Sequence, residues 1–303
     1  MTNDSPVVVV GATGMLGRQV VDALLSRGKR VRALVRPASD PTALTKAGVE
    51  IARGDMMEPA SLLRVMDGAD AVITTAAGYT RHSKGDTAMI DTVGNRNLID
   101  VASQTGVRRF VLTSILTSDQ TPEVPHFWNK KLAEDRLEQK GVPFVSLRPG
   151  AFLDSIIQMG GDSFAKGRVM WFGSTTIPLT FVLTEDVADY LADALYVPGV
   201  DGQRIDIGWD RPVSIQEVAQ VAGRLLGREI RVRSLPAGVI NTISTVVGKV
   251  SPTVNDMGAM LRWFQTGQYV ADPTRQREVF GEVPTAEEAI TRLVQRLGHP
   301  VAG

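Results

Sequence analysis

The sequence predicts a doubly wound α/β fold, in which helices cover both faces of a parallel sheet. Two observations predict it: apolar runs of strand length alternate with amphipathic segments of helix length, and a glycine-rich turn joins the first run to the first such segment. Continuous apolar strands are typical of sheets that are buried on both faces. Right-handed crossovers between such strands produce the doubly wound arrangement.

The elements alternate regularly up to residue 147. The first apolar run, Val7–Val10, ends at Gly11, and the apolar positions between Met15 and Leu25 have helical spacing before Gly28 ends that helix. The remaining strands are expected at Val31–Val35, Val49–Ala52, Ala71–Thr74, Arg109–Thr113 and Pro143–Leu147. The remaining helices are expected near Pro41–Ala47, Pro59–Met66, Asp86–Thr105 and His126–Lys140.

After Pro149 and Gly150 the alternation becomes less regular. We therefore expect residues 1–150 to form a Rossmann domain that binds NAD(P), and residues 151–303 to form a smaller, mixed substrate-binding region. Segments from about residue 177 to 208 are expected to return to the sheet. The elements expected in this region are strands Ile177–Leu183 and Arg204–Ile207, and helices from Thr184, at Ser214–Leu226, and near Val239–Val247, Val254–Gln265 and Ala286–Leu297. Ser214, with Glu217 three residues later, is a typical helix cap.

Composition excludes several classes of protein. Lys plus Arg and Asp plus Glu both number 33, so the formal net charge is zero, which disfavours a nucleic-acid partner. The chain has no Cys, and its three His lie far apart, so neither disulfides nor a metal site are expected. No apolar run is long enough to span a membrane. The N-terminus does not resemble a secretion signal, so the expected location is the cytoplasm.

The most informative motif is the turn Gly11-Ala12-Thr13-Gly14-Met15-Leu16-Gly17. The first Gly permits a tight turn, the second allows the backbone to approach a pyrophosphate, and the third lets helix and strand pack closely. Free amides and the helix dipole then face the phosphates. The candidate cofactor contacts in this turn are Gly11, Thr13, Gly14, Met15, Leu16 and Gly17. A tight strand-to-helix turn without a ligand is the alternative.

Arg36 occupies the end of the second strand, nineteen residues after Gly17. NAD-binding folds usually have an acidic residue there, whereas Arg accommodates the additional phosphate of NADP. Arg36 therefore predicts a preference for NADP, and Arg32 is a weaker candidate. A surface Arg in contact with solvent is the alternative.

Two further loops follow expected strand ends. Asp55, next to Met56, is a candidate acceptor for the adenine amino group, although Asp is equally suited to cap the next helix. The small residues after the fourth strand would let the backbone approach a cofactor, or they form an ordinary loop; they are Thr75, Ala76, Ala77 and Gly78.

Together these residues resemble the atypical branch of the short-chain dehydrogenase/reductase superfamily, which includes NAD(P)-binding proteins similar to NmrA and to NADPH-quinone oxidoreductases. Gly11–Gly17 matches the family's Gly-x-x-Gly-x-x-Gly, Arg36 its NADP-selecting Arg, and Gly54-Asp55 its adenine-side pair. Asp91–Asp100 resembles the family's central helix, and Phe110–Ser114 resembles its fifth strand. Leu147–Gly150 resembles its sixth strand, and Glu185–Ala188 resembles the start of its late helix. The resemblance covers nearly the whole chain. It implies NADP(H) as cofactor and adds Pro149 to the candidate cofactor contacts.

The chain departs from the family at its catalytic pair. Most active members carry Tyr and Lys four residues apart after the fifth strand, whereas this chain has His126 in the Tyr position and Lys130 in the Lys position. Of the four Tyr in the chain, only Tyr79 lies at an expected strand-end loop. The departure disfavours alcohol and ketone chemistry that depends on Tyr, and it disfavours an epimerase or dehydratase that holds NAD.

Helical geometry distinguishes Lys130 from Lys131. Lys130 belongs to a partly apolar stripe that should face the sheet, namely His126, Lys130, Ala133 and Leu137. Lys131 belongs to a charged stripe that suits solvent, namely Lys131, Asp135 and Glu138. Lys130 is therefore the candidate for contact with the nicotinamide ribose, with a surface Lys as the alternative.

Three more side chains are catalytic candidates. His126 could donate a proton, but a helix-entry residue in contact with solvent is slightly favoured. The hydroxyls of Thr113 and Ser114 could orient a substrate at the end of the fifth strand, or they close the strand-end loop.

Two functions fit these observations. The first is an NADPH-dependent oxidoreductase that transfers hydride to a small apolar carbonyl acceptor of the quinone or enone type, as a monomer or homodimer. The second is a non-catalytic NADP(H)-binding sensor that regulates a protein partner. The first is favoured, and the two differ in whether bound NADPH is consumed.

Overall fold

The computed structural model describes residues 5–78, 89–235 and 251–300. The chain forms two compact units. The first contains residues 1–119, 126–148 and 184–205, and the second contains residues 120–125, 149–183 and 206–303. The chain therefore passes between the units several times and does not divide at one position.

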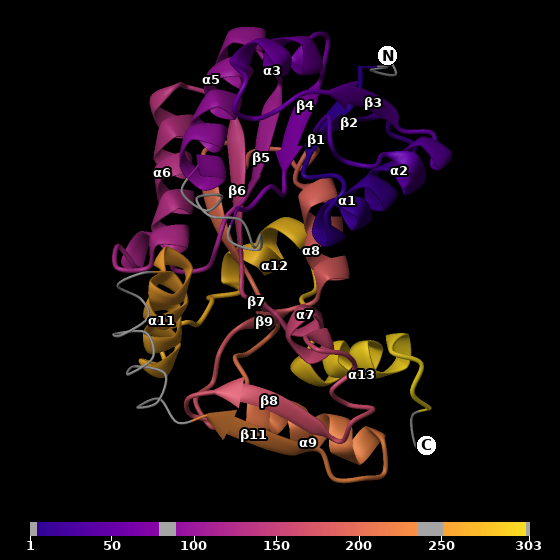
Figure 1. Cartoon of the computed structure of the whole chain (residues 1–303), viewed down its shortest axis with the longest axis vertical. Coiled ribbons are helices and arrows are strands. Elements are labelled where there is room, and N and C mark those ends of the chain that lie inside the picture. Colours follow the sequence, from indigo (N-terminus) through magenta and orange to yellow (C-terminus); the bar gives the residue numbers. More distant parts are fainter. Residues whose placement is uncertain (1–4, 79–88, 236–250, 301–303) are drawn as a thin grey trace. The chain divides into compact units, whose positions relative to one another are not determined.

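A seven-stranded sheet is the centre of the first unit (Figure 1), and its strand order is β10-β6-β5-β4-β1-β2-β3. The strands are β1 (Val7–Val10), β2 (Val31–Val35), β3 (Glu50–Arg53), β4 (Ala71–Thr74), β5 (Arg109–Thr113), β6 (Phe144–Pro149) and β10 (Gln203–Ile207). β1 pairs in parallel with β2 on one side and with β4 on the other. The order therefore reverses at β1, which is where such sheets bind ligands beyond their carboxyl ends. The doubly wound sheet predicted from the sequence is confirmed.

Helices pack on both faces of this sheet. On one face lie α3 (Pro59–Met66), α5 (Asn95–Thr105) and α6 (Pro125–Gln139), and their apolar side chains form one buried cluster with those of the strands. The other face carries α1 (Met15–Ser26), which packs against α8 (Thr184–Asp193). Arg27 joins these two helices through Asp189 and Asp193, each at 2.9 Å. The short α2 (Thr42–Lys46) precedes β3.

The helix expected at Asp86–Thr105 is not one continuous α-helix. Residues 86–88 lie outside the described part of the chain, Met89–Gly94 form a π-helical segment (η1), and α5 begins only at Asn95. Gly94, the last residue of this segment, packs closely on Met56, since a Cβ on Gly94 would lie 3.3 Å from the Met56 side chain. π-Helical turns inside longer helices are frequent at functional sites.

The second unit contains two small parallel sheets and five helices among its described residues. β7 (Ala151–Phe152) pairs with β9 (Phe181–Val182), and β8 (Arg168–Phe172) pairs with β11 (Arg231–Leu235). The helices are α7 (Leu153–Gln158), α9 (Ile215–Leu225), α11 (Pro252–Gln265), α12 (Thr274–Phe280) and α13 (Ala286–Arg296).

The second unit contains some of the strands, caps and helices predicted for it and differs in others. The strand expected at Ile177–Leu183 is shorter than expected, because the Thr180 amide donates to Tyr269 outside the sheet. The Ser214 cap is confirmed, since its hydroxyl accepts from the Glu217 amide at 3.1 Å. The helix expected near Val239–Val247 lies outside the described residues. β8 and β11 were not predicted.

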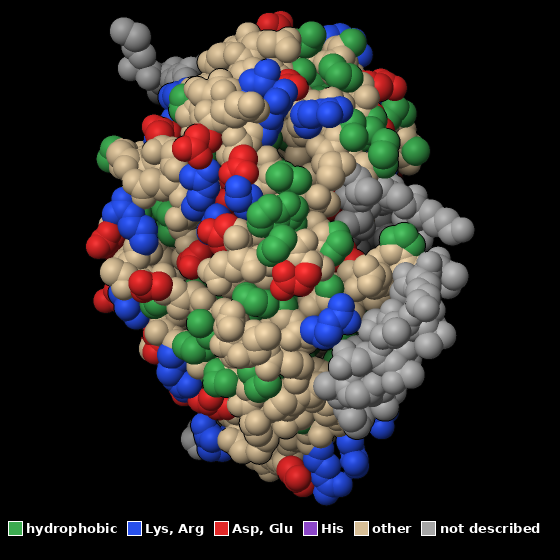
Figure 2. Space-filling view, turned by 90° about the vertical axis from the view of Figure 1, so that its left-hand side faces the viewer, with side chains coloured by type: hydrophobic (Ala, Val, Ile, Leu, Met, Phe, Trp, Pro, Cys, Tyr) green, Lys and Arg blue, Asp and Glu red, His purple; other side chains and the backbone are tan. Residues whose placement is uncertain are grey.

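The surface in Figure 2 carries Lys and Arg side chains interspersed with Asp and Glu, rather than a field of one sign. No helix in the described ranges is both long and apolar enough to cross a bilayer. Within the same ranges, no three His, Asp or Glu side chains come together as a potential metal site.

Candidate functional site

The glycine-rich turn links β1 to α1 with very little room for side chains. Gly11 has a positive φ of 86°, and a Cβ there would lie 2.7 Å from Thr75 Oγ1. A Cβ on Gly17 would lie 2.1 Å from the carbonyl oxygen of Gly11. Gly11 is therefore required by the backbone conformation, and Gly17 by the packing of the helix on the turn.

The N-terminus of α1 has the features of an anion site. Gly14 is its cap residue and offers no side chain to the first-turn amides, and no acidic residue lies in that turn. The amides of Met15, Leu16 and Gly17 have no intrahelical carbonyl to bond. They can therefore donate to a phosphate together with the positive end of the helix dipole. Thr13 lies beside them and accepts a bond from Arg18 through its carbonyl.

Arg32 and Arg36, four residues apart, have different environments. Arg32 donates to Glu50 at 2.6 Å and to the carbonyls of Val65 and Asp67, so it holds β2 in place. Arg36 is exposed just after β2, and its guanidinium has no bonding partner among the described residues. Of these two residues, Arg36 is the one available for an anionic ligand.

Arg53, at the end of β3, supports the loop that begins at Arg36. Its Nη1 donates to the carbonyls of Arg36 at 2.8 Å and of Ser39 at 2.9 Å. The guanidinium thus fixes the loop backbone and adds a second positive charge beside Arg36. Arg53 was not among the predicted contacts, although an Arg at the end of the neighbouring strand was a detectable signal.

A cavity of about 190 Å³ extends from the glycine-rich turn to Arg36 and Asp55. Its lining includes Gly11, Thr13, Arg36, Asp55, Met56 and Ala76. Asp55 does not cap α3, whose cap residue is Glu58. Instead, its Oδ1 accepts from the Met57 amide at 2.9 Å, which leaves Oδ2 for a donor in the cavity. The structure thus brings together six of the predicted cofactor contacts around one cavity.

The loop after β4 connects this cavity to a buried Lys. Thr75 bonds back to Val10 through both its amide and its hydroxyl, which sets Ala76 against the cavity. The Ala76 carbonyl accepts from Lys130 Nζ at 3.1 Å. Two residues on, the Gly78 amide donates to Asp91 at 3.2 Å. Ala77 lies between these contacts, and Tyr79 is outside the described residues.

Lys130 and Asp91 are a buried pair of opposite charges. Lys130 is 4% exposed and Asp91 2% exposed, and 3.8 Å separates Lys130 Nζ from Asp91 Oδ1. Burial lowers the pKa of the Lys130 ammonium, and the opposing effects of Asp91 and Glu134 do not compensate for it. The pKa of Lys130 therefore lies below that of an ordinary Lys. Asp91 was missed as its partner because it lies on the unpredicted π-helical segment.

The predicted orientation of α6 is confirmed. Its inward stripe is buried, namely His126, Lys130, Ala133 and Leu137, whereas Lys131 pairs with Asp135 on the outer face. The solvent-contact alternative for His126 is wrong, because this side chain is only 4% exposed. Its ring packs edge-on against Phe127, with 4.7 Å between the centroids.

Two buried hydroxyls lie at the carboxyl end of β5, on its last residue and on the residue after it. Thr113 Oγ1 and Ser114 Oγ are solvent-inaccessible, and neither has a hydrogen-bond partner in the described part of the chain. An unsatisfied buried hydroxyl is costly unless a ligand or a water molecule bonds it. Both are thus available to a polar ligand atom.

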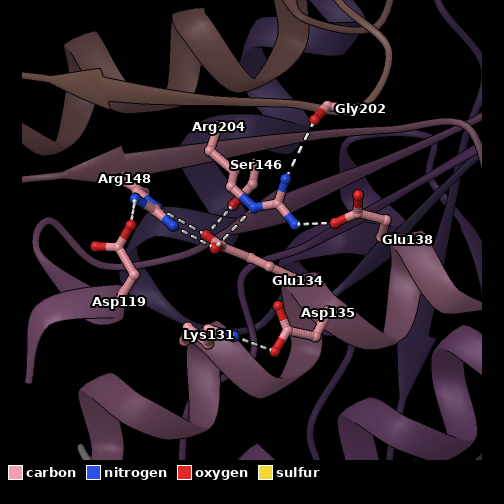
Figure 3. A network of polar contacts seen from close by, with 9 residues as sticks. All are labelled: Asp119, Lys131, Glu134, Asp135, Glu138, Ser146, Arg148, Gly202 and Arg204. Carbon is pink, nitrogen blue, oxygen red and sulfur yellow. Dashed lines mark hydrogen bonds and ion pairs between the residues drawn. The ribbon is translucent and has the colours of Figure 1, made fainter. Parts of the chain in front are cut away.

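One turn beyond Lys130, Glu134 is the centre of a polar network (Figure 3). This carboxylate is fully buried and accepts from Arg148 Nε at 3.0 Å and from Arg148 Nη2 at 2.6 Å. Ser146 donates to it at 2.7 Å, and Arg148 also reaches Asp119 at 2.8 Å. Burial opposes the charge of Arg148, but the bonds to Glu134 and Asp119 raise its pKa overall. The network fixes α6 against β6, which ends at Pro149.

These features fit a dinucleotide with an additional phosphate. The turn has no space for side chains at its glycines, no side chain caps the first-turn amides of α1, and Arg36 has no bonding partner in the described part of the chain. The cavity is lined by Asp55 and by Ala76, and the Ala76 carbonyl accepts a hydrogen bond from Lys130. The residues that could hold such a ligand therefore lie along one edge of the sheet.

Comparisons with known proteins are consistent with this geometry. The model of the NmrA-like family matches residues 3–288. The photosystem II assembly factor Ycf39 of Synechocystis sp. is 26% identical over 94% of this chain and 82% of its own length. The NAD(P)H azoreductase of Xenophilus azovorans is 27% identical over 74% of this chain and 75% of its own. The crystal structure of an NADPH-dependent quinone oxidoreductase from Escherichia coli matches with a TM-score of 0.75 and 19% identity, over 95% of this chain and 99% of that one.

Proposed function

The chain belongs to the NmrA-like family, and from this premise we propose that it is an NADPH-dependent oxidoreductase. It transfers hydride to a small apolar carbonyl acceptor of the quinone or enone type. One observation carries the proposal: the cavity between the glycine-rich turn and Arg36 is lined by Ala76, and the carbonyl of Ala76 bonds the buried ammonium of Lys130. A cofactor site and a candidate catalytic cation are thus joined by a single residue.

Bound NADPH supplies the hydride, and the chain's own residues bind and orient the reactants. The amides of Met15, Leu16 and Gly17 would hold the pyrophosphate, Arg36 would hold the additional phosphate, and Asp55 would accept from the adenine amino group. Lys130 holds the nicotinamide ribose and stabilises the negative charge that develops on the acceptor oxygen. The hydroxyls of Thr113 and Ser114 would donate hydrogen bonds to that oxygen, and water would supply the proton that completes the reduction. Residues 151–303 contribute the substrate-binding surface.

The acceptor class follows from the residues at the catalytic pair. His126 occupies the Tyr position, so the chain lacks the phenol that most active relatives use to protonate a ketone oxygen. A quinone or an enone distributes the new charge over a conjugated system and needs less help from such an acid. The azoreductase and the quinone oxidoreductase among the similar proteins are named for electron-poor acceptors, which supports this class.

The experiment has two stages in one sample of wild-type protein. NADPH binding is first confirmed from cofactor fluorescence, and NADPH consumption is then followed by absorbance with a panel of quinones and enones. We expect consumption that depends on the acceptor and saturates with it. Binding without consumption across the whole panel would contradict the proposal.

That contradicting outcome would favour a second function, a non-catalytic NADP(H)-binding sensor acting on a protein partner. Its supporting observation is the relationship to a photosystem II assembly factor, which is named for assembly rather than for a reaction. The cytoplasmic location and the monomeric or dimeric state stay predictions.

A further inference from the structure

A second groove lies entirely within the second unit, between α9 and β11. It encloses about 860 Å³. One wall is a single face of α9, formed by Gln216, Ala219, Gln220, Gly223 and Arg224. The other wall is the strand that runs from Ile230 through Arg233. Figure 1 shows α9 beside the two-stranded sheet of β8 and β11.

The β11 edge that faces away from β8 is not paired with any described strand. The amide of Arg231 donates to Gly167, and the carbonyl of Leu235 accepts from Gly173, so the odd-numbered residues of β11 bond toward β8. In a parallel pair the intervening residues direct their backbone groups to the opposite edge. Val232 and Ser234 therefore each present an N–H and a C=O to a further strand.

Side chains on the two faces of β11 differ in character. Val232 is partly buried on the face toward α9, where Ala219 is buried and Gly223 has no side chain. Arg231 and Arg233 alternate onto the other face and are exposed. A strand added to this edge would place alternate side chains against the apolar floor and beside the two Arg.

The groove has a strong positive charge. Its lining contains four Arg and one Glu: Arg224, Arg228, Arg231, Arg233 and Glu229. Arg228 is fixed by its bond to the Phe164 carbonyl at 2.6 Å, and Arg231 contacts Glu229 at 3.2 Å. Arg224 and Arg233 have no bonding partner among the described residues. The unneutralised charge favours an acidic ligand.

We propose that this groove binds an extended acidic segment of a partner protein, which adds as a strand to β11 and alternates small apolar with acidic residues. The apolar side chains contact Val232, Ala219 and Gly223, and the acidic side chains pair with Arg231 and Arg233. Val232 and Ser234 supply the backbone hydrogen bonds. This proposal concerns a different unit from the cofactor cavity and does not depend on catalysis.

The test uses a fluorescein-labelled peptide in which valine and glutamate alternate, and its binding to the full chain is followed by fluorescence anisotropy. We expect saturable binding that weakens as salt is added. The double variant Arg231→Glu/Arg233→Glu should weaken it by at least about tenfold, since two charge-assisted contacts are lost. Val232→Pro should weaken it as well, because it removes an outward N–H that pairing with β8 does not use. Arg64→Glu, an exposed charge reversal on α3, should leave it unchanged.

Several results would overturn the proposal. The first is absence of binding, and the second is equal binding of a peptide with lysine in place of glutamate. The third is equal binding of a peptide whose alternate amides are methylated, because binding without those N–H groups would indicate charge attraction without strand addition. Binding of phosphatidylserine vesicles with no binding of the peptide would assign the Arg residues to a membrane surface instead. Thermal unfolding of each variant verifies that it is folded. The two β11 variants test different contacts, because Arg231→Glu/Arg233→Glu reverses side-chain charges whereas Val232→Pro removes a backbone N–H.

Discussion

Lys130 and Glu134 lie one turn apart on the buried side of α6, yet they engage their partners differently. Glu134 accepts two bonds from Arg148 and one from Ser146, all at 3.0 Å or less. Among the described residues, Lys130 bonds one backbone carbonyl, and its oppositely charged neighbour Asp91 is 3.8 Å away. The first group is fully used by the fold, and the second retains hydrogen-bonding capacity. The difference teaches that burial alone does not identify a functional charge, whereas incomplete pairing does.

The same contrast recurs on β2. Arg32 is committed to Glu50 and to two carbonyls, whereas Arg36 has no bonding partner among the described residues. A fully bonded cation stabilises the fold, and a cation with unused donors is available to a ligand. Substitutions at fully bonded and at incompletely bonded charges should therefore have different effects.

Glu134→Gln should lower the free energy of unfolding by about 3 kcal/mol or more, because it removes the buried carboxylate of the pair and leaves Arg148 with only the partly exposed Asp119. Urea denaturation measures the change. The matched control is Glu138→Gln, one turn further along α6, where a 68% exposed carboxylate pairs with Arg204. That variant should change the free energy of unfolding by less than about 1 kcal/mol. Equal losses for both would break the comparison.

Arg36→Ala should weaken NADPH binding by about tenfold or more, because a charge-assisted contact contributes about 1.5–3 kcal/mol. NADH binding should be almost unchanged, since NADH lacks the additional phosphate. Calorimetric titration with both cofactors measures the ratio. Arg32→Ala is the control and should lower thermal stability without altering the NADPH-to-NADH ratio. If Arg36→Ala weakened both cofactors equally, its assigned role would be wrong.

The lowered pKa of Lys130 predicts a smaller effect, on the pH dependence of stability. Between the folded-state pKa and the ordinary value of 10.5, the unfolded chain holds the proton while the folded chain has lost it. The free energy of unfolding contributed by this group should therefore rise with pH across that window. The difference in this free energy between wild type and Lys130→Met, followed from neutral to alkaline pH, isolates the effect. A difference that falls or stays constant would contradict the lowered pKa.

Much of the site could be predicted because its signals are local. The three Gly between residues 11 and 17 occupy positions where a side chain would collide with the backbone, so their spacing reports the geometry directly. The stripe of α6 could be predicted as well, because helical periodicity separates Lys130 from Lys131. The position of Arg36 at the end of a strand could also be predicted, whereas its contact with the additional phosphate stays a prediction.

Features that depend on distant contacts could not be predicted. Asp91 reaches Lys130 from a π-helical segment, and no sequence pattern distinguishes that winding from an α-helix. The solvent-contact alternative for His126 was wrong because burial of the first turn of α6 depends on packing outside the helix. β8 and β11 were missed because they pair across more than sixty residues. In β8, moreover, the apolar Met170 and Phe172 occupy exposed positions, so the alternation of buried and exposed residues is not visible in the sequence.

The central claim is that Lys130, rather than the adjacent Lys131, acts on the reacting groups. Its most direct test is the single-turnover rate of NADPH oxidation by a quinone, measured by rapid mixing with cofactor already bound, for Lys130→Met and Lys131→Met. The account predicts that Lys130→Met slows the reaction by about 100-fold, the magnitude typical of losing a group that stabilises a developing oxyanion. Lys131→Met should react at the wild-type rate. Equal rates for the two variants would contradict the account.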